Sequence, residues 1–153
     1  MYYVIDKDAL FELAKAEISK VADEAYTEDG LSLYDSIILT ERDRDTVGDY
    51  IDDAVTQFVR REFSVTKNSP YDQMQSGVMV TIPRLEFNVP DFDTAMEPYL
   101  VKELNRYITL FVCAAIFQHR RAAVVPEYTN RTQSAMDKAV SILKSRKQPV
   151  SQW

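Results

Sequence analysis

The longest hydrophobic pattern in the chain lies between residues 99 and 121 and predicts the central helix of the fold. In its first half, apolar residues recur every three or four positions, as at Leu100, Leu104 and Ile108, which is the spacing of one helix face. Residues 107–117 are apolar on nearly every side, and such a helix is buried among other helices or in lipid. The apolar run is far shorter than the roughly 20 residues that span a bilayer. We therefore expect a core helix.

Other segments carry the same helical periodicity in weaker form. They predict helices over residues 7–26, 42–62 and 129–145, because each has one apolar stripe and one polar face. Asp6 is the expected N-cap of the first of these helices. The short apolar stretch 33–40 fits either a helix or a strand, and we favour a short helical lead-in.

The period changes to two between residues 77 and 89, which predicts extended chain. Apolar residues alternate with others on both sides of Pro83, and proline marks a turn or a sheet edge because it has no N–H to donate. We expect residues 77–82 and 85–89 to form a short hairpin or a bent extended arm, with residues 63–75 as a preceding loop. An isolated two-stranded hairpin is marginal in water, so it must lean on helices or pair with a neighbouring subunit.

Together these patterns predict a mainly α protein. The expected fold is a helical bundle around the apolar helix at 99–121, with an inserted β-hairpin or extended arm at 77–89. Residues 1–149 are expected to form one helical domain, with a connector at 122–128 that Pro126 breaks. Residues 150–153 form a C-terminal tail that ends in the only tryptophan.

Charge is distributed unevenly along the chain. The net charge is −6, which gives no support to general nucleic-acid binding. Residues 1–99 contain nine Lys/Arg and 21 Asp/Glu, a net charge of −12, whereas residues 100–153 contain nine and three, a net charge of +6. Such a split suits contacts between copies of the chain. The alternative is that these charges form ordinary solvated helix faces.

Residues typical of catalysis or metal binding are sparse. His119 and Cys113 are the only histidine and the only cysteine, which excludes an ordinary zinc site and an intrachain disulfide. Asp49 and Asp53 share a helix face, but we expect that face to be solvated. A Ser/His/Asp triad is not excluded by spacing, although a helix-capping role for His119 is favoured. We expect no enzyme, no catalytic residue, no cofactor and no metal.

The order of the elements resembles the head–tail connector, or adaptor, proteins of tailed bacteriophages. The resemblance is carried by the segments VGDYIDDAVTQFVRREF (47–63), LVKELNRYITLFVCAAIFQHRR (100–121) and NRTQSAMDKAVSILKSRKQP (130–149). It implies a structural virion protein of the neck, made in the host cytoplasm. It also implies a ring, usually of twelve copies, that docks to the portal protein and to a tail or second neck protein. DNA would pass through the channel of this ring without sequence-specific binding, and no membrane is involved.

If the resemblance holds, the arm and the C-terminal end make the contacts to other chains. The residues predicted to contact another subunit or the portal are Val78, Val80, Ile82, Arg84, Leu85, Phe87, Arg146, Lys147 and Trp153. Two alternatives remain open at this point. One is a soluble helical interaction or regulatory module with no virion role, and the other is an enzyme that uses His119 or the Asp49 and Asp53 face.

Overall fold

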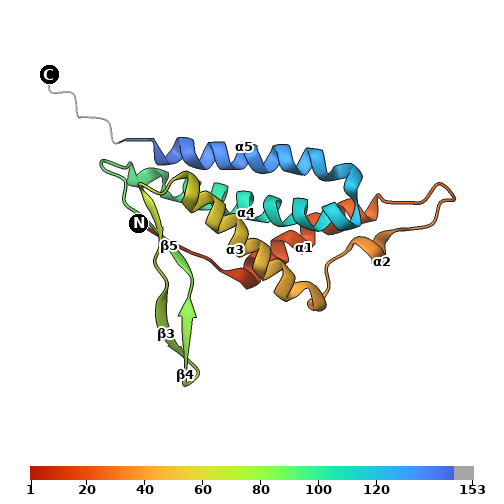
Figure 1. Ribbon diagram of the computed structural model, residues 1–153, viewed down its shortest axis with the longest axis horizontal. Coiled ribbons are helices and arrows are strands. Elements are labelled where there is room, and N and C mark those ends of the chain that lie inside the picture. The colour runs from red at the N-terminus through yellow and green to blue at the C-terminus, as the bar shows by residue number, and fades with distance from the viewer. Residues whose placement is uncertain (147–153) are drawn as a thin grey trace.

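The computed structural model describes residues 1–146 and is mainly helical, with small antiparallel sheets (Figure 1). The helices are α1 (Lys7–Asp23), α2 (Tyr34–Ile37), α3 (Arg44–Arg61), α4 (Glu97–Arg120) and α5 (Val125–Leu143). The strands are β1 (Tyr2–Val4), β2 (Thr66–Asn68), β3 (Tyr71–Gln75), β4 (Val78–Ile82) and β5 (Arg84–Phe87). The predicted mainly α class is therefore confirmed, and the fold includes an inserted hairpin, which β3 and β4 form.

Helix α4 lies at the centre of the helical part, as its apolar sequence predicts. It packs against α5 on one side and against α1 and α3 on the other (Figure 1). Almost all of its apolar second half is buried, including Tyr107, Cys113 and Phe117. The Tyr107 hydroxyl donates a hydrogen bond of 2.8 Å to the carbonyl oxygen of Ala54 in α3, which satisfies this buried group, whereas the buried Thr109 hydroxyl of the same helix has no partner among the described residues.

Helix α1 begins where predicted and ends earlier than predicted. The Asp6 carboxylate accepts a hydrogen bond of 3.0 Å from the backbone N–H of Ala9, which confirms the predicted N-cap. The helix stops at Asp23 rather than near Tyr26, because Tyr26 pairs with Ser32 across the following loop. The predicted short helical lead-in at 33–40 is confirmed by α2.

The strands pair differently from the prediction. Of the two predicted forms of residues 77–89, the hairpin between 77–82 and 85–89 is wrong, because β4 pairs with β3, while β5 lies between β1 and β2 in a three-stranded sheet. The other predicted form, a bent extended arm, agrees with this arrangement. The predicted loop at 63–75 is also wrong, since β2 and β3 fall inside it. Pro83 separates β4 from β5, and its carbonyl oxygen accepts a hydrogen bond of 2.9 Å from the N–H of Ile5. The chain therefore bends at Pro83 and passes from one sheet to the other.

The last connector is shorter than predicted. Pro126 does not break the chain, because it lies in the first turn of α5, where its missing N–H has no helical partner to lose. A 3-10 turn at Ala122–Val124 joins α4 directly to α5. Lys147 and the predicted tail at 150–153, with Trp153, lie outside the described residues.

Candidate interaction site at the projecting hairpin

The hairpin of β3 and β4 projects away from the helical part (Figure 1). Its register runs from Tyr71 opposite Ile82 to Gln75 opposite Val78, which leaves a two-residue turn at Ser76 and Gly77. Both turn residues have positive φ, 49° and 80°, as a type I′ turn requires. This turn matches the right-handed twist of the strands, so local sequence alone defines the shape of the tip.

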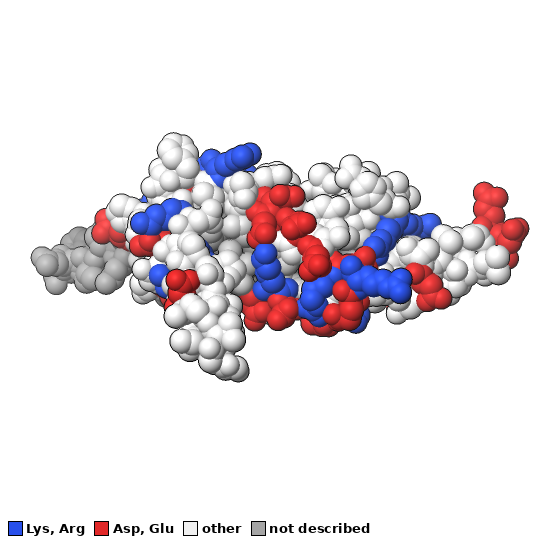
Figure 2. Space-filling view, turned by 60° about the horizontal axis from the view of Figure 1, so that its bottom comes forward, with Lys and Arg blue, Asp and Glu red and all other residues white. Residues whose placement is uncertain are grey.

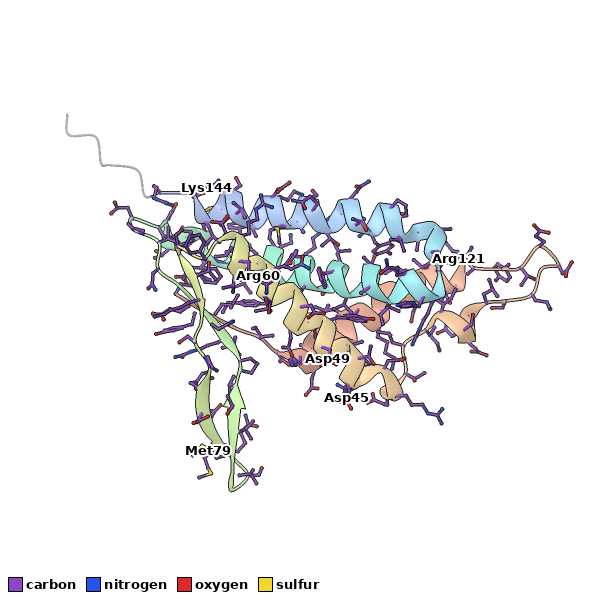
Figure 3. The ribbon with its side chains drawn as sticks, in the orientation of Figure 1. Asp45, Asp49, Arg60, Met79, Arg121 and Lys144 are labelled. Atoms are coloured by element: carbon purple, nitrogen blue, oxygen red, sulfur yellow. The ribbon has the colours of Figure 1, made fainter. Side chains whose placement is uncertain are left out.

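The end of the hairpin exposes apolar side chains. Met74, Val78 and Met79 are 61%, 62% and 59% exposed. Between residues 71 and 82 the only charged residue is Asp72, whose carboxylate accepts a 2.8 Å hydrogen bond from the Thr81 hydroxyl. The hairpin is accordingly almost entirely white in Figure 2, whereas red and blue side chains gather over the neighbouring helices. Figure 3 places Met79 at the far end of the hairpin.

Both outer edges of the hairpin are open within the described chain. β3 and β4 pair only with each other, so each presents an unpaired row of N–H and C=O groups. Proteins usually protect such edges with lysines, prolines or bulges, and here prolines stand only before β3 and after β4, at Pro70 and Pro83. An edge with a single charged residue and several apolar side chains is suited to binding another chain by strand addition.

Arg84 fixes the base of the hairpin. Its guanidinium lies over the rings of Tyr2 and Tyr71, 3.9 Å and 4.5 Å from their centroids, and its Nε donates a hydrogen bond of 2.7 Å to the carbonyl oxygen of Ser69. These contacts join β1, the start of β3 and β5. Arg84, a predicted contact residue, is therefore engaged within its own chain.

The other predicted contact residues fall into separate environments. Val78 is exposed, and Val80 and Ile82 are half-buried on the same face of the hairpin. Leu85 and Phe87 are only 1% and 5% exposed, and the Phe87 ring meets Phe58 edge-on at 6.2 Å.

The contact prediction is thus corrected at Leu85 and Phe87, because β5 is the central strand of its sheet and turns these two side chains into the core. Arg146 is exposed after α5, and its backbone forms a bridge with Phe92. The sequence analysis missed β3 with Met74, and did not select Met79. The dipeptide Ser76-Gly77 is a turn signal that could have revealed this pairing.

The residues considered for catalysis lie apart from one another. Asp49 and Asp53 are exposed on α3, and Asp45 and Asp49 point outward near its N-terminal end in Figure 3. His119 is exposed in the last turn of α4. Cys113 is fully buried, and burial raises the pKa of its thiol far above the ordinary value, which disfavours the reactive thiolate.

Within residues 1–146, no group of three or more His, Cys, Asp or Glu side chains is arranged to hold a metal ion. In the same residues, none of the helices has the combined length and apolarity that crossing a bilayer requires.

Ion pairs between the acidic and the basic parts of the sequence hold the helices together. Arg120 donates to both carboxylate oxygens of Asp43, at 2.6 Å and 3.3 Å, and to the carbonyl oxygen of Ile38 at 2.9 Å. Arg131 pairs with Glu17 at 3.2 Å. Some acidic residues of the first 99 positions therefore pair with basic residues of the last 54 within one chain, and these charges are not available for contacts between copies.

The Asp43 carboxyl illustrates the balance of forces in such a pair. Burial by itself raises its pKa, but hydrogen bonds from Arg120 and from the backbone N–H of Thr40, together with the charge of Arg120, outweigh burial and hold the pKa below its ordinary value. The carboxylate is charged at neutral pH and stabilises the junction of α2, α3 and α4.

Comparisons with known proteins identify no relative. No protein-family model, curated protein or solved structure matches the chain. The resemblance to phage connectors therefore stays a prediction from the sequence.

Proposed function

We propose that this chain is a structural virion protein, a subunit of a neck ring that joins the portal to the tail of a bacteriophage and continues the DNA channel. In this proposal the helices form a bundle around α4 that serves as the rigid body of each subunit. The protein is not an enzyme. Its partners are further copies of itself, the portal protein, and a tail or second neck protein. A ring of twelve copies, as the resemblance to connectors implies, is the first stoichiometry to test.

The projecting β3–β4 hairpin is the observation that carries this proposal. It extends from the helical part, exposes Met74, Val78 and Met79, and has two open edges. Two strands alone bury too little apolar surface to be stable in water. A partner chain that covers the hairpin would supply the missing burial, and a ring subunit has such a partner on each side.

The acidic side chains of the first 99 residues also fit a DNA channel. Asp45, Asp49 and Asp53 lie exposed along α3, and Figure 2 shows acidic side chains over the helical part, with Lys and Arg side chains among them. Like charges repel DNA phosphates. A ring that turned such a face inward would let DNA pass without binding it.

The direct test is to measure the mass of the purified chain alone and after mixing with a portal protein from the same genome. The proposal expects a complex of the portal with several copies of this chain. A chain that stays monomeric and never joins a portal or tail-protein complex would refute it. The portal is needed in the assay, because a connector that assembles only on its portal is monomeric by itself.

A soluble helical interaction module without a virion role is the second candidate, because the exposed hairpin suits any protein partner. Neighbouring genes discriminate between the two proposals. Genes for portal, capsid and tail proteins beside this one favour the connector, and their absence favours the interaction module.

A further inference from the structure

A groove without charged side chains runs between α4 and α5, beside α3. Its volume is about 320 Å³. Small side chains at Ala114, Ala115 and Thr129 leave this space open between the two helices, and Phe111 and Met136 give it an apolar lining. The remaining lining residues are Gln57, Tyr107, Gln118, Val125, Thr132 and Gln133. The groove can therefore offer apolar contact together with amide and hydroxyl groups.

The absence of charge separates this groove from other hollows of similar size. The hollows beside Lys20, Arg44 and Arg106 each contain several charged side chains. A charged wall disfavours apolar side chains, because its ions would lose water when the hollow is covered. Among these hollows, the groove between α4 and α5 is the one suited to an uncharged, largely apolar occupant.

The tip of the hairpin has the matching chemistry. Residues 73–80 contain Met74, Val78 and Met79, with glutamines, a serine and a glycine, and no charged residue. Methionine side chains are flexible and fill irregular apolar grooves. The glutamine amides of the tip can exchange hydrogen bonds with Gln118 and Gln133 at the rim of the groove.

We infer that the groove between α4 and α5 binds the hairpin tip of a second copy of this chain, with Met79 entering beside Ala115. The occupant is a second copy because the chain itself carries the uncharged apolar projection that the groove fits. Each strand has five residues, so the hairpin reaches about 17 Å from its base. That length allows the tip to enter a neighbour while the two helical parts stay side by side.

The hairpin and the groove are different surfaces, so the contact is head-to-tail. Head-to-tail contacts leave one free hairpin and one free groove at the ends of a chain of subunits, and they close into rings when the rotation allows. The inference rests on the proposed ring, but it concerns which surfaces meet. It therefore has its own test.

The test is disulfide cross-linking between two single variants of the full chain, Met79→Cys and Ala115→Cys. They are mixed at high concentration, with and without portal protein, and oxidised. We expect a heterodimer joined through positions 79 and 115, identified by peptide mass. The wild-type chain, whose Cys113 is buried, should give no product. Leu31 lies on another loop and its side chain is 67% exposed. The control variant Leu31→Cys should therefore form no cross-link with Ala115→Cys.

A charge placed in the groove supplies a second readout. Adding Thr129→Glu to the Ala115→Cys chain should abolish the cross-link, because Thr129 lines the groove. The matched change Asn130→Glu, one residue along α5, should leave it intact. Circular dichroism shows whether both variants remain folded.

The remaining outcomes separate the inference from the proposed ring. Groove binding is overturned if a portal complex forms without any 79–115 cross-link, or if a cross-link forms only between two copies of Met79→Cys. Neither result contradicts the proposed neck ring. A 79–115 link in a chain that never joins a portal supports groove binding and refutes the virion role.

Discussion

The helical part and the β3–β4 hairpin are stabilised in opposite ways. Around α4, aromatic side chains are buried and in contact, as at Phe58, Phe87 and Tyr107. Charged groups there are paired across helices, as at Arg120 and Asp43. The hairpin has neither feature at its tip, where Met74 and Met79 face solvent across from each other.

This difference separates the residues that stabilise the fold from those that we propose bind a partner. The helical part buries most of its apolar side chains and pairs several charged groups within one chain, so these residues are constrained by stability. The hairpin is held in shape by its turn and by Arg84 at its base, while its tip contributes little to the core. Residues at the tip are free to be selected for a partner, and the following predictions separate the two kinds of residue.

The largest effect is expected for Phe58→Ala. Phe58 is 1% exposed and its ring lies 6.0 Å from that of Tyr107 and 6.2 Å from that of Phe87. Truncating it removes buried apolar surface and leaves a cavity, at a cost of about 3 to 5 kcal/mol in the free energy of unfolding. Urea denaturation followed by circular dichroism measures this loss. A loss below about 1 kcal/mol would mean that α3, α4 and β5 do not share one core.

A smaller, pH-dependent effect is expected for Asp43→Asn. The folded-state pKa of Asp43 lies below its ordinary value, so its pair with Arg120 stabilises the fold fully at pH values above the ordinary carboxyl pKa of about 4. This stabilisation is lost as the pH falls through the lower folded-state pKa. At neutral pH the variant should lose about 1.5 to 3 kcal/mol, the range for hydrogen bonds to charged groups.

The pH dependence of the stability difference distinguishes the effect of the Asp43–Arg120 pair from the general loss of stability in acid. The difference between wild type and Asp43→Asn should shrink as the pH is lowered below 4, measured by denaturation at several pH values. Asp49→Asn is the matched control, because Asp49 is exposed on α3. Equal pH profiles for wild type and Asp43→Asn would contradict the assignment.

The sequence predicts the helical part well for a physical reason. Helices α1, α3 and α5 each bury one face, so apolar residues recur with the helical period, and α4 is recognised because its second half is apolar on nearly every side. Asp6 marks the start of α1 by its capping carboxylate. The ends are less well predicted. Pro126 reads as a breaker in sequence, yet it is equally compatible with the first turn of a helix.

The strands are predicted only in part, because little of their surface is buried. Strand β4 has alternating apolar residues and is recognised, whereas β3, with the sequence YDQMQ, is exposed along most of its length and shows no such contrast. Strand β1 is three residues long. The pairing of the strands depends on how the chain bends at Pro83. The sequence around Pro83 is compatible with both a hairpin and a bent arm, so it does not decide which strands pair. The sequence therefore predicts contact residues in the hairpin only where apolar residues alternate, at Val78, Val80 and Ile82.

Glycine-to-alanine changes in the two regions should have opposite effects. Gly77 has φ of 80° at the hairpin turn, where a side chain costs about 1 to 2 kcal/mol. Gly77→Ala should therefore open the hairpin locally and speed amide hydrogen exchange in residues 71–82, with little change in the unfolding midpoint of the helices.

Gly48→Ala is the matched change in the helical part. Gly48 lies within α3, and an added Cβ would meet only the Lys7 side chain at an ordinary 3.9 Å. Because alanine favours helix by about 1 kcal/mol over glycine, this variant should be more stable than wild type in urea denaturation. Global destabilisation by Gly77→Ala equal to that of a core variant would show that the hairpin and helices fold as one unit.

The smallest effect on stability is expected for Met79→Gln. This variant separates an effect on partner binding from an effect on folding most clearly. Met79 is 59% exposed, so the change should alter the free energy of unfolding by no more than about 0.5 kcal/mol, as for other surface substitutions. The same change removes the apolar side chain with which the tip would bind a partner, so portal-dependent assembly, followed by mass measurement, should weaken while the monomer stays folded. Leu13→Gln, at a 48% exposed leucine of α1, is the matched control and should leave assembly intact. Equal assembly by both variants would place recognition outside the hairpin, whereas a large loss of monomer stability in Met79→Gln would mean that the tip belongs to the core after all.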